Sequence, residues 1–457
     1  MERKEKKSLS RRAFLKNTSA GIAGAATISA VGGASLYCGT GKNADVPAVL
    51  GGTPVRTEPF PSWPVYDQTD VQMYLDAYHS KKWCRMGGTR VDKFEKKFAG
   101  LMGVPHCAAT NSGTTALNTS LNALGIGPGD EVIVPPYTFV ATAGVVFQVF
   151  ALAVFVDTDP ETHQINADLI EQRITEHTKA IMPVHIAGGA ADMDKITAVS
   201  RKYGIPVIED ACQAWMGEWK NKKLGSLGDL GCFSFQASKN LNSGEGGAII
   251  SSNEDLIDLC VSYTNNGRPA GVKRSTLSGY PFPGSNHRMT EFQGAILQGQ
   301  MRRLEQQTGL RSENAAYLDK LLEDIAGISP AKTYPGQTRH AYHLYMMRYD
   351  KKYFNGLPKG KFTQAMEAEG IPVRTGYKPL NKEGFIEYRL NSRAFKSVFP
   401  KERLDKYRRQ NRCPENDRIC AETGLWLGQY VLLGTKKDME DIAAAIVKIQ
   451  KNSAKLV

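Results

Sequence analysis

One lysine of this sequence lies where an ammonium group is costly to place. Residues 233–235 have the pattern of the end of a buried strand, a glycine-rich turn follows Asn242, and Lys239 lies between them. A lysine in such a place usually forms a salt bridge or extends its charged end to water. It can also serve as a neutral amine that forms an imine with a carbonyl compound. The neighbouring residues must decide between these interpretations.

Two other polar groups lie where predicted strands end. In "NSGTTAL", Gly113 and Thr114 lie between a strand and an amphipathic helix, and the free amides of a helix N-terminus favour a phosphate. The same residues could also form an ordinary helix cap. Asp210 closes the apolar run "PVIEDA", where a buried carboxylate needs a cation or hydrogen-bond donors. It could form an internal salt bridge or neutralise a protonated ring nitrogen.

Together these groups match the needs of one cofactor. A phosphate cradle, an acid for a pyridinium nitrogen and an amine for an imine are what pyridoxal phosphate requires of a protein. Asp210 would keep the ring nitrogen protonated, so that the ring can withdraw electrons from a carbanion formed beside the imine. Phe139, in "PPYTF" at another strand end, is placed to cover the face of the ring. The sequence therefore predicts a pyridoxal phosphate site.

The elements that must position these residues follow from the hydrophobic periodicity. Short apolar runs alternate with helical patterns such as "TTALNTSLNAL", in which Leu117 and Leu121 fall on one face. This alternation predicts an α/β fold with a mostly parallel seven-stranded sheet that is covered on both faces. Functional residues in such sheets cluster beyond the carboxyl ends of the strands. The predicted strands are residues 106–110, 131–135, 153–159, 180–186, 205–211, 231–235 and 247–252.

The pattern of the sequence changes after about residue 305. "ENAAYLDKLLEDI" predicts a helix with one apolar stripe that consists of Leu318, Leu321, Leu322 and Ile325, and "AYHLYMMRYD" alternates like a strand. "KDMEDIAAAIVKIQ" predicts an amphipathic helix near the C-terminus. We therefore expect an N-terminal arm and a large domain over residues 41–305, and a smaller α+β domain over residues 306–457.

The first forty residues have the composition of an export signal. "SRRAFLK" precedes a weakly apolar stretch rich in Gly and Ala, and paired arginines in this position are typical of twin-arginine signal peptides. We expect residues 1–40 to engage the twin-arginine export machinery, with a disordered basic tail before a buried helix as the alternative. Cys38 could suggest lipidation, but Tyr37 directly before it fits a lipoprotein site poorly. The expected location is the periplasm or another compartment outside the cytoplasm, and the cytoplasm is the alternative.

The distribution of charge argues against nucleic-acid binding. The formal net charge is +12, but the first sixteen residues alone hold seven Lys or Arg against two Glu. The remaining sequence has no basic run and no zinc-finger spacing, so we expect neither a nucleic-acid partner nor a metal site. We expect no membrane span other than the signal.

Ordered motifs connect most of the chain to a known family. From about Gly51 to the C-terminus the sequence resembles the DegT/DnrJ/EryC1/StrS family, the sugar aminotransferases of pyridoxal phosphate fold type I. "GGTPVRTEPFPSWP" is similar to the N-terminal arm of that family. The other motifs follow in the family's order: "NSGTTAL", "PPYTFVATA", "VHIAGGAADM", "IEDACQA", "FSFQASKNLNSGEGG" and "GSNHRMTEFQGAIL".

The resemblance implies a role for each matching residue. Lys239 would bind the cofactor covalently and then act as the base of a proton shift. Asp210 would pair with the pyridine nitrogen, and Gln213 would lie near the ring hydroxyl. Arg288 could bind the carboxylate of the amino donor or form a structural ion pair. The phosphate would be held by Gly113, Thr114 and Ser234, and by Asn286 of a neighbouring subunit, so the active unit would be a homodimer.

The resemblance also indicates the reaction. Members of the family that dehydrate their substrate carry histidine in place of the lysine, so Lys239 indicates transamination. "SFQ" and the arm resemble the cyclitol branch, which includes glutamine:scyllo-inosose aminotransferases. An exported enzyme would rarely meet nucleotide-activated sugars, so we expect transfer of an amino group from glutamine or glutamate to a keto-cyclitol or keto-sugar. The alternatives are a nucleotide-sugar aminotransferase, or a non-catalytic sugar-binding or regulatory protein on the same fold.

Overall fold

The computed structural model describes residues 43–271 and 276–457. The expected signal peptide at residues 1–40 lies outside the described residues. Residues 43–457 form one compact unit.

Seven strands form the central sheet, as the apolar runs predict. They are β1 (His106–Thr110), β2 (Glu131–Val134), β3 (Leu152–Phe155), β4 (Thr178–Ile181), β5 (Ile208–Asp210), β8 (Leu230–Ser234) and β9 (Gly247–Ser251). Five strands run parallel in the order β3-β2-β4-β5-β8, with isolated parallel bridges from Ile181 to Val207 and from Val184 to Asp210 joining β4 to β5. β9 runs antiparallel between β8 and β1. The predicted mostly parallel sheet is confirmed.

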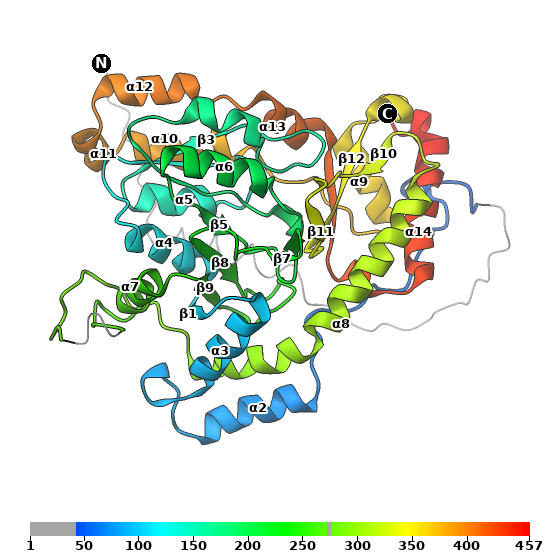
Figure 1. Ribbon diagram of the computed structural model, residues 1–457. Coiled ribbons are helices and arrows are strands. Elements are labelled where there is room, and N and C mark those ends of the chain that lie inside the picture. The colour runs from blue at the N-terminus through cyan, green and yellow to red at the C-terminus, as the bar shows by residue number, and fades with distance from the viewer. Residues whose placement is uncertain (1–42, 272–275) are drawn as a thin grey trace, which may run out of the picture. The chain divides into compact units, whose positions relative to one another are not determined.

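Helices cover both faces of this sheet (Figure 1). The helices concerned are α3 (Arg90–Met102), α4 (Gly113–Ala123), α5 (Ala141–Gln148), α6 (Met193–Tyr203), α7 (Glu254–Thr264) and α8 (Glu291–Leu322). α4, α5 and α7 share a core with Ala108 and Val132, whereas α3, α6 and the first part of α8 share one with Ala109 and Ile133. Successive strand residues point to opposite faces, so strands buried on both sides read as continuous apolar runs.

A smaller antiparallel sheet builds the second core. It consists of β10 (Ile328–Pro330), β12 (Leu344–Tyr349) and β13 (Gly424–Gly428), and α9 (Lys359–Ala368), α14 (Lys436–Asn452) and the second half of α8 pack against it. Leu318 and Leu322 of the predicted helical stripe are buried in this core and Leu321 is partly buried against it, whereas Ile325 is buried beyond the end of α8 at Leu322. The strand in "AYHLYMMRYD" and the amphipathic helix near the C-terminus are also present. The smaller α+β part of the fold is therefore confirmed.

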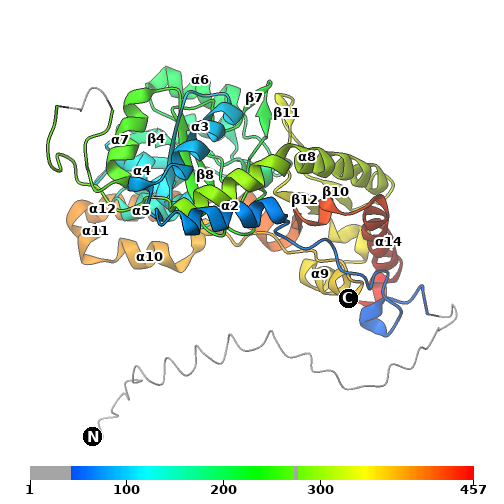
Figure 2. The same cartoon turned by 90° about the horizontal axis from the view of Figure 1, so that it is seen from below.

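Part of the C-terminal region packs back onto the large sheet. The helices α10 (Gly384–Leu390), α11 (Arg393–Val398) and α12 (Lys401–Gln410) lie together beside α5 (Figure 2). Phe395 and Leu404 belong to the core of the large sheet, and the Tyr407 hydroxyl donates to the carbonyl of Ala153 at 2.9 Å. α8 also runs without interruption through residue 305. The division into domains at residues 305 and 306 therefore stays a prediction, and the large sheet takes core residues from both sides of it.

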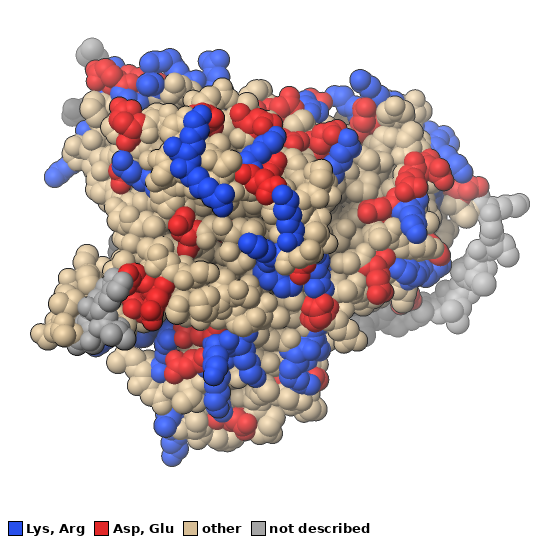
Figure 3. All heavy atoms as spheres, viewed as in Figure 1, with Lys and Arg blue, Asp and Glu red and all other residues tan. Residues whose placement is uncertain are grey.

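The remaining elements lie around these two cores. They are the helices α2 (Gln68–His79) and α13 (Pro414–Arg418) and a small sheet of β6 (Glu218–Trp219), β7 (Lys222–Lys223) and β11 (Gln337–Arg339). None of the helices in the described part of the chain has the length and apolar character needed to cross a membrane. On the face shown in Figure 3, Lys and Arg side chains are interspersed with Asp and Glu.

A fully buried carboxylate anchors a loop to the middle of the sheet. Glu209 of β5 accepts hydrogen bonds of 2.6–2.8 Å from three backbone amides of the loop 225–228 and one of 2.8 Å from His185 Nε2. His185 Nδ1 accepts from the amide of Ala191 at 3.2 Å, so the ring is the neutral tautomer that donates through Nε2.

We predict that Glu209→Ala lowers the free energy of unfolding by about 3–5 kcal/mol, because it leaves these buried donors unsatisfied. Urea denaturation followed by circular dichroism measures the change. The control is Glu176→Ala, whose side chain is 81% exposed and which should change stability by less than about 0.5 kcal/mol. Equal stabilities of the two variants would contradict the prediction.

Candidate active site

A cavity of about 470 Å³ opens where β5 and β8 end and α4 begins. β5 and β8 are parallel neighbours, so the residues at their carboxyl ends meet at one edge of the sheet. The structure brings together seven of the nine predicted site residues in the lining of this cavity: Gly113, Thr114, Phe139, Asp210, Gln213, Ser234 and Lys239.

The amine of Lys239 has no counter-charge close enough for an ion pair. Its backbone amide donates to the carbonyl of Gln236 at 2.8 Å, which closes the turn after β8. Among the described residues no carboxylate forms an ion pair with Nζ, which lies 5.9 Å from the centre of the Trp215 ring. Burial lowers the pKa of the amine, and the nearby Cys212 and Asp210 only oppose this shift. The geometry thus favours the neutral amine over the structural salt bridge.

Asp210 is a buried carboxylate that likewise lacks a cation. It is 4% exposed at the end of β5. Oδ2 accepts a hydrogen bond of 2.8 Å from Thr142 Oγ1, and Oδ1 accepts one of 3.2 Å from the amide of Cys212. No Lys, Arg or His side chain of residues 43–271 or 276–457 forms an ion pair with it. A carboxylate held by neutral donors can keep its charge for a cation brought by a ligand.

The N-terminus of α4 forms a narrow cradle. Ser112 caps the helix by accepting from the amide of Thr115 at 3.1 Å, while the amides of Gly113 and Thr114 have no partner among the described residues. A Cβ atom at position 113 would lie 2.6 Å from the Cβ of Ser234, so only glycine allows the helix end to approach β8 so closely. Free amides at a helix N-terminus next to hydroxyl groups are suited to a phosphate.

Gln213 connects the cavity to two other parts of the chain. Its Oε1 accepts from the amide of Ala187 at 2.8 Å, and its Nε2 donates to the Tyr377 hydroxyl at 2.9 Å. Burial raises the pKa of Tyr377 to about 12, so the hydroxyl stays protonated at neutral pH. Phe139 lines the cavity with 57% of its surface exposed, so its ring is available to a bound group or a second chain.

The last two predicted residues do not line this cavity. Asn286 is exposed and pairs with Asn265 through an isolated antiparallel bridge. Arg288 Nη1 donates to the side-chain oxygens of Asn265 at 3.0 Å and Asn266 at 2.8 Å. Arg288 forms no ion pair with a described residue, and its role toward the carboxylate of the amino donor stays a prediction. The role of Asn286 toward a neighbouring subunit stays a prediction.

Some lining residues were not identified from the sequence. Thr142 lines the cavity and donates a hydrogen bond to Asp210. It lies in the motif "PPYTFVATA", of which only Phe139 was predicted to belong to the site. Cys212 lies in "IEDACQA", and burial, followed by the charge of Asp210, raises the pKa of its thiol. His343 comes from a run that reads only as a strand, so the sequence carried no signal for it.

The lining fits pyridoxal phosphate group by group. The buried acid Asp210 has no cationic partner among the described residues and suits a protonated ring nitrogen, and the amine of Lys239 suits the aldehyde carbon. The amides of Gly113 and Thr114 with the Ser234 hydroxyl suit the phosphate, in a cradle that a Cβ at position 113 would fill. Among the described residues no cluster of His, Cys, Asp or Glu could hold a metal ion.

Comparisons with known proteins agree with this fit. L-glutamine:2-deoxy-scyllo-inosose aminotransferase from Streptoalloteichus tenebrarius is 35% identical over 421 residues, which cover 90% of this chain and 98% of the relative. The enzyme of the same name from Streptomyces fradiae is 35% identical over 424 residues, with the same coverage of both chains. 3-Amino-5-hydroxybenzoate synthase from Amycolatopsis mediterranei is 32% identical over 392 residues, which cover 85% of this chain and 96% of that one.

Solved structures show the same architecture. The crystal structure of 3-amino-5-hydroxybenzoic acid synthase superimposes with a TM-score of 0.74 at 31% identity, covering 88% of this chain and 100% of that one. An aminotransferase from Psychrobacter cryohalolentis gives a TM-score of 0.75 at 27% identity, with 87% and 100% coverage. These matches confirm the predicted fold class. The sequence model of the DegT/DnrJ/EryC1/StrS aminotransferase family matches residues 65–447, and the chain belongs to this family of pyridoxal phosphate-dependent aminotransferases.

Proposed function

We propose that this aminotransferase moves an amino group from L-glutamine to a keto-cyclitol. The observation that carries the proposal is the match to the two L-glutamine:2-deoxy-scyllo-inosose aminotransferases, which extends over 98% of their length. The cavity supplies the groups that such a reaction needs. Glutamine is preferred to glutamate as the donor because both of these relatives are L-glutamine-dependent aminotransferases.

Different residues of the cavity have different roles in the proposed reaction. Pyridoxal phosphate supplies, when bound, an electron-withdrawing ring that carries the amino group between substrates. Gly113, Thr114 and Ser234 would bind its phosphate, and Asp210 would hold a proton at the ring nitrogen. Lys239 Nζ would hold the cofactor covalently and would also serve as the base that moves a proton at the reacting centre. Its lowered pKa leaves a larger share of the amine free to accept that proton.

We predict that the purified protein, loaded with pyridoxal phosphate, aminates 2-deoxy-scyllo-inosose at the expense of L-glutamine. Lys239→Ala should reduce the rate at least about 100-fold, because it removes both the covalent link and the base. Mass spectrometry measures the aminocyclitol product, and intact mass after borohydride reduction measures the covalent link. The control Lys195→Ala alters only ion pairs with Asp168 and Asp192 at the protein surface and should leave both readouts unchanged.

Other outcomes of this experiment would favour the other candidates. A structure of DesI, solved in the presence of its TDP-sugar product, superimposes with a TM-score of 0.73 at 25% identity. Amination of a TDP-keto-sugar, with no turnover of the cyclitol, would therefore support a nucleotide-sugar aminotransferase. A colourless protein that binds the ketone without consuming glutamine would support a binding protein. Either result would overturn the proposed reaction.

We infer that a second copy of the chain completes the active site. α2 packs on α8, and an aromatic cluster lies there in which Tyr78 stacks on Trp83 and Phe292 makes tilted ring contacts with Tyr74 and Trp83. Tyr78 and Trp83 are each 50% exposed, and Met86 nearby is 58% exposed. An exposed aromatic patch of this kind is characteristic of an interface between proteins. The exposed Asn286 could then reach the phosphate of the other subunit, as predicted from the family resemblance.

We predict that the double substitution Tyr78→Asp with Trp83→Asp shifts the protein from a dimer to a chain of 50.1 kDa, because it places two charges in the apolar patch. Sedimentation velocity measures the mass. Tyr388→Asp is the matched control, since this tyrosine is 80% exposed on α10 and does not belong to the patch. A monomeric parent protein, or a double variant that remains dimeric, would contradict the inference.

We also propose that the protein is exported after folding. The support is the sequence "SRRAFLK" followed by the Gly- and Ala-rich apolar stretch. Twin-arginine export carries folded proteins, so pyridoxal phosphate could be bound before transport. A free keto-cyclitol is also a more accessible substrate outside the cytoplasm than a nucleotide-activated sugar.

We predict that Arg11→Lys combined with Arg12→Lys retains the protein in the cytoplasm, because twin-arginine recognition depends on the pair. Cell fractionation followed by immunoblotting measures the location. Arg3→Lys is the control and should not change it, since Arg3 lies outside the pair. If the double variant and the parent are found in the same fraction, the export proposal is wrong, whereas the proposed reaction is unaffected.

A further inference from the structure

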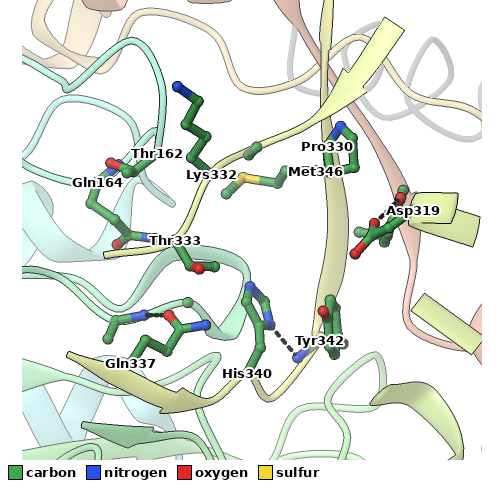
Figure 4. A pocket seen from close by; sticks show the side chains of 14 residues that line it. Thr162, Gln164, Asp319, Pro330, Lys332, Thr333, Gln337, His340, Tyr342 and Met346 are labelled. Carbon is green, nitrogen blue, oxygen red and sulfur yellow. Dashed lines mark hydrogen bonds between the residues drawn. The ribbon is translucent and has the colours of Figure 1, made fainter. Parts of the chain in front are cut away.

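Two histidines of one short segment face two different cavities. His340 and Tyr342 line a cavity of about 430 Å³, in which the His340 ring stacks on Tyr342 with centroids 4.1 Å apart (Figure 4). His343, three residues after His340, lines the active-site cavity instead. The backbone amide of His343 donates to the carbonyl of Ala187 at 2.8 Å, which fixes the segment behind Gln213.

Asn240, the residue after Lys239, determines which nitrogen of His343 carries the proton. Asn240 Nδ2 donates to the carbonyl of Ala341 at 2.9 Å, and this bond fixes the orientation of the amide. Asn240 Oδ1 then points at His343 Nδ1, 3.1 Å away. An amide oxygen can only accept, so Nδ1 carries the hydrogen and donates it. In the neutral ring Nε2 therefore keeps a lone pair and can only accept.

The surroundings keep this ring neutral. His343 is 7% exposed, and its ring packs edge-on against Trp215 with centroids 5.8 Å apart. Burial lowers the pKa of His343 well below its usual range, and the positive charge of Arg311 lowers it further. Nε2 makes no hydrogen bond to any residue of the described part of the chain. The active-site cavity thus has a fixed hydrogen-bond acceptor close to the reactive lysine.

The position of His343 also places this acceptor where a ring-shaped substrate has room. His343, Gln236 and Ser238 line both the active-site cavity and an outer hollow of about 700 Å³. The N-terminal arm forms one wall of the hollow through residues 61–64, and Trp63 Nε1 donates to the carbonyl of Ala237 at 3.0 Å. A substrate that extends beyond the reacting carbon and its neighbours would reach from the active-site cavity into the outer hollow, and would lie next to His343.

We propose that His343 is a specificity-determining residue whose Nε2 accepts a hydrogen bond from a hydroxyl group of the keto-cyclitol. The proposal rests on the proposed function, because it needs a hydroxylated ketone as the amino acceptor. A lone pair attracts an O–H group and repels a ketone oxygen, which has no hydrogen to donate. The acceptor therefore favours the orientation in which a ring hydroxyl faces His343 and the carbonyl is left for Lys239.

Two substitutions separate the two nitrogens of the ring. In His343→Asn the side-chain amide can still donate to Asn240, as Nδ1 does, but the group at the position of Nε2 is lost. In His343→Gln a longer side chain places an amide oxygen near the position of Nε2 and restores an acceptor. The probes are L-glutamine as donor and two ketones, 2-deoxy-scyllo-inosose and cyclohexanone, which has no hydroxyl groups.

The expected result is a loss confined to the hydroxylated ketone. His343→Asn should lower kcat/KM for 2-deoxy-scyllo-inosose roughly twofold to tenfold, as expected for one hydrogen bond, and leave that for cyclohexanone unchanged. The loss should appear in KM rather than kcat, the half-reaction with L-glutamine should keep its rate, and His343→Gln should recover part of the loss. His340→Asn is the control and should match the parent protein, since His340 lines the other cavity.

Two outcomes would overturn the proposal. Equal losses of kcat/KM for both ketones, or a slowed half-reaction with L-glutamine, would show that His343 supports the site as a whole. An unchanged kcat/KM for 2-deoxy-scyllo-inosose in His343→Asn would show that no hydroxyl contacts it. These results are distinct from failure of the proposed function, in which the parent protein itself would not aminate 2-deoxy-scyllo-inosose.

Discussion

The structure depends on a buried acid and a buried amine that share one cavity and are not paired with each other. Asp210 is satisfied by the Thr142 hydroxyl and an amide, and Lys239 has no carboxylate within ion-pair distance among the described residues. Had they formed a salt bridge, neither would be free to engage a ligand. A buried pair kept apart is costly for folding, so the surrounding polar contacts are best understood as support for binding.

The arrangement of the strands and of the turn after them keeps Asp210 and Lys239 apart. Asp210 at the end of β5 lies beside Cys232 of the parallel strand β8, Ser234 ends β8 two residues further on, and Lys239 follows five residues after Ser234 on a turn that lines the cavity. Glu209, the residue before Asp210 on β5, holds the loop 225–228 and the His185 ring by hydrogen bonds. Glu209 thus stabilises the fold and Asp210 lines the cavity, because consecutive strand residues point in opposite directions.

Sequence reasoning succeeded where a signal was local and failed where it was not. The seven strands were predictable because burial on both faces leaves continuous apolar runs, and Asp210 and Lys239 because a charge at the end of such a run is conspicuous. His343 was missed because it lies 104 residues beyond Lys239 in a run that reads as an ordinary strand. The return of Phe395 and Leu404 to the large sheet was missed because an amphipathic helix does not encode which core will receive it.

The cavity shows a common pattern in how its polar groups are held. Gln213 uses its side-chain oxygen on the amide of Ala187, His343 uses Nδ1 on Asn240, and Asp210 accepts from Thr142. Each group makes at least one hydrogen bond to the protein, and that contact fixes its orientation in the cavity. A site that must receive two different substrates in turn benefits from this arrangement, because neither substrate has to reorganise the walls on binding. Selectivity then follows from which hydrogens a substrate can offer to acceptors whose orientation is already set.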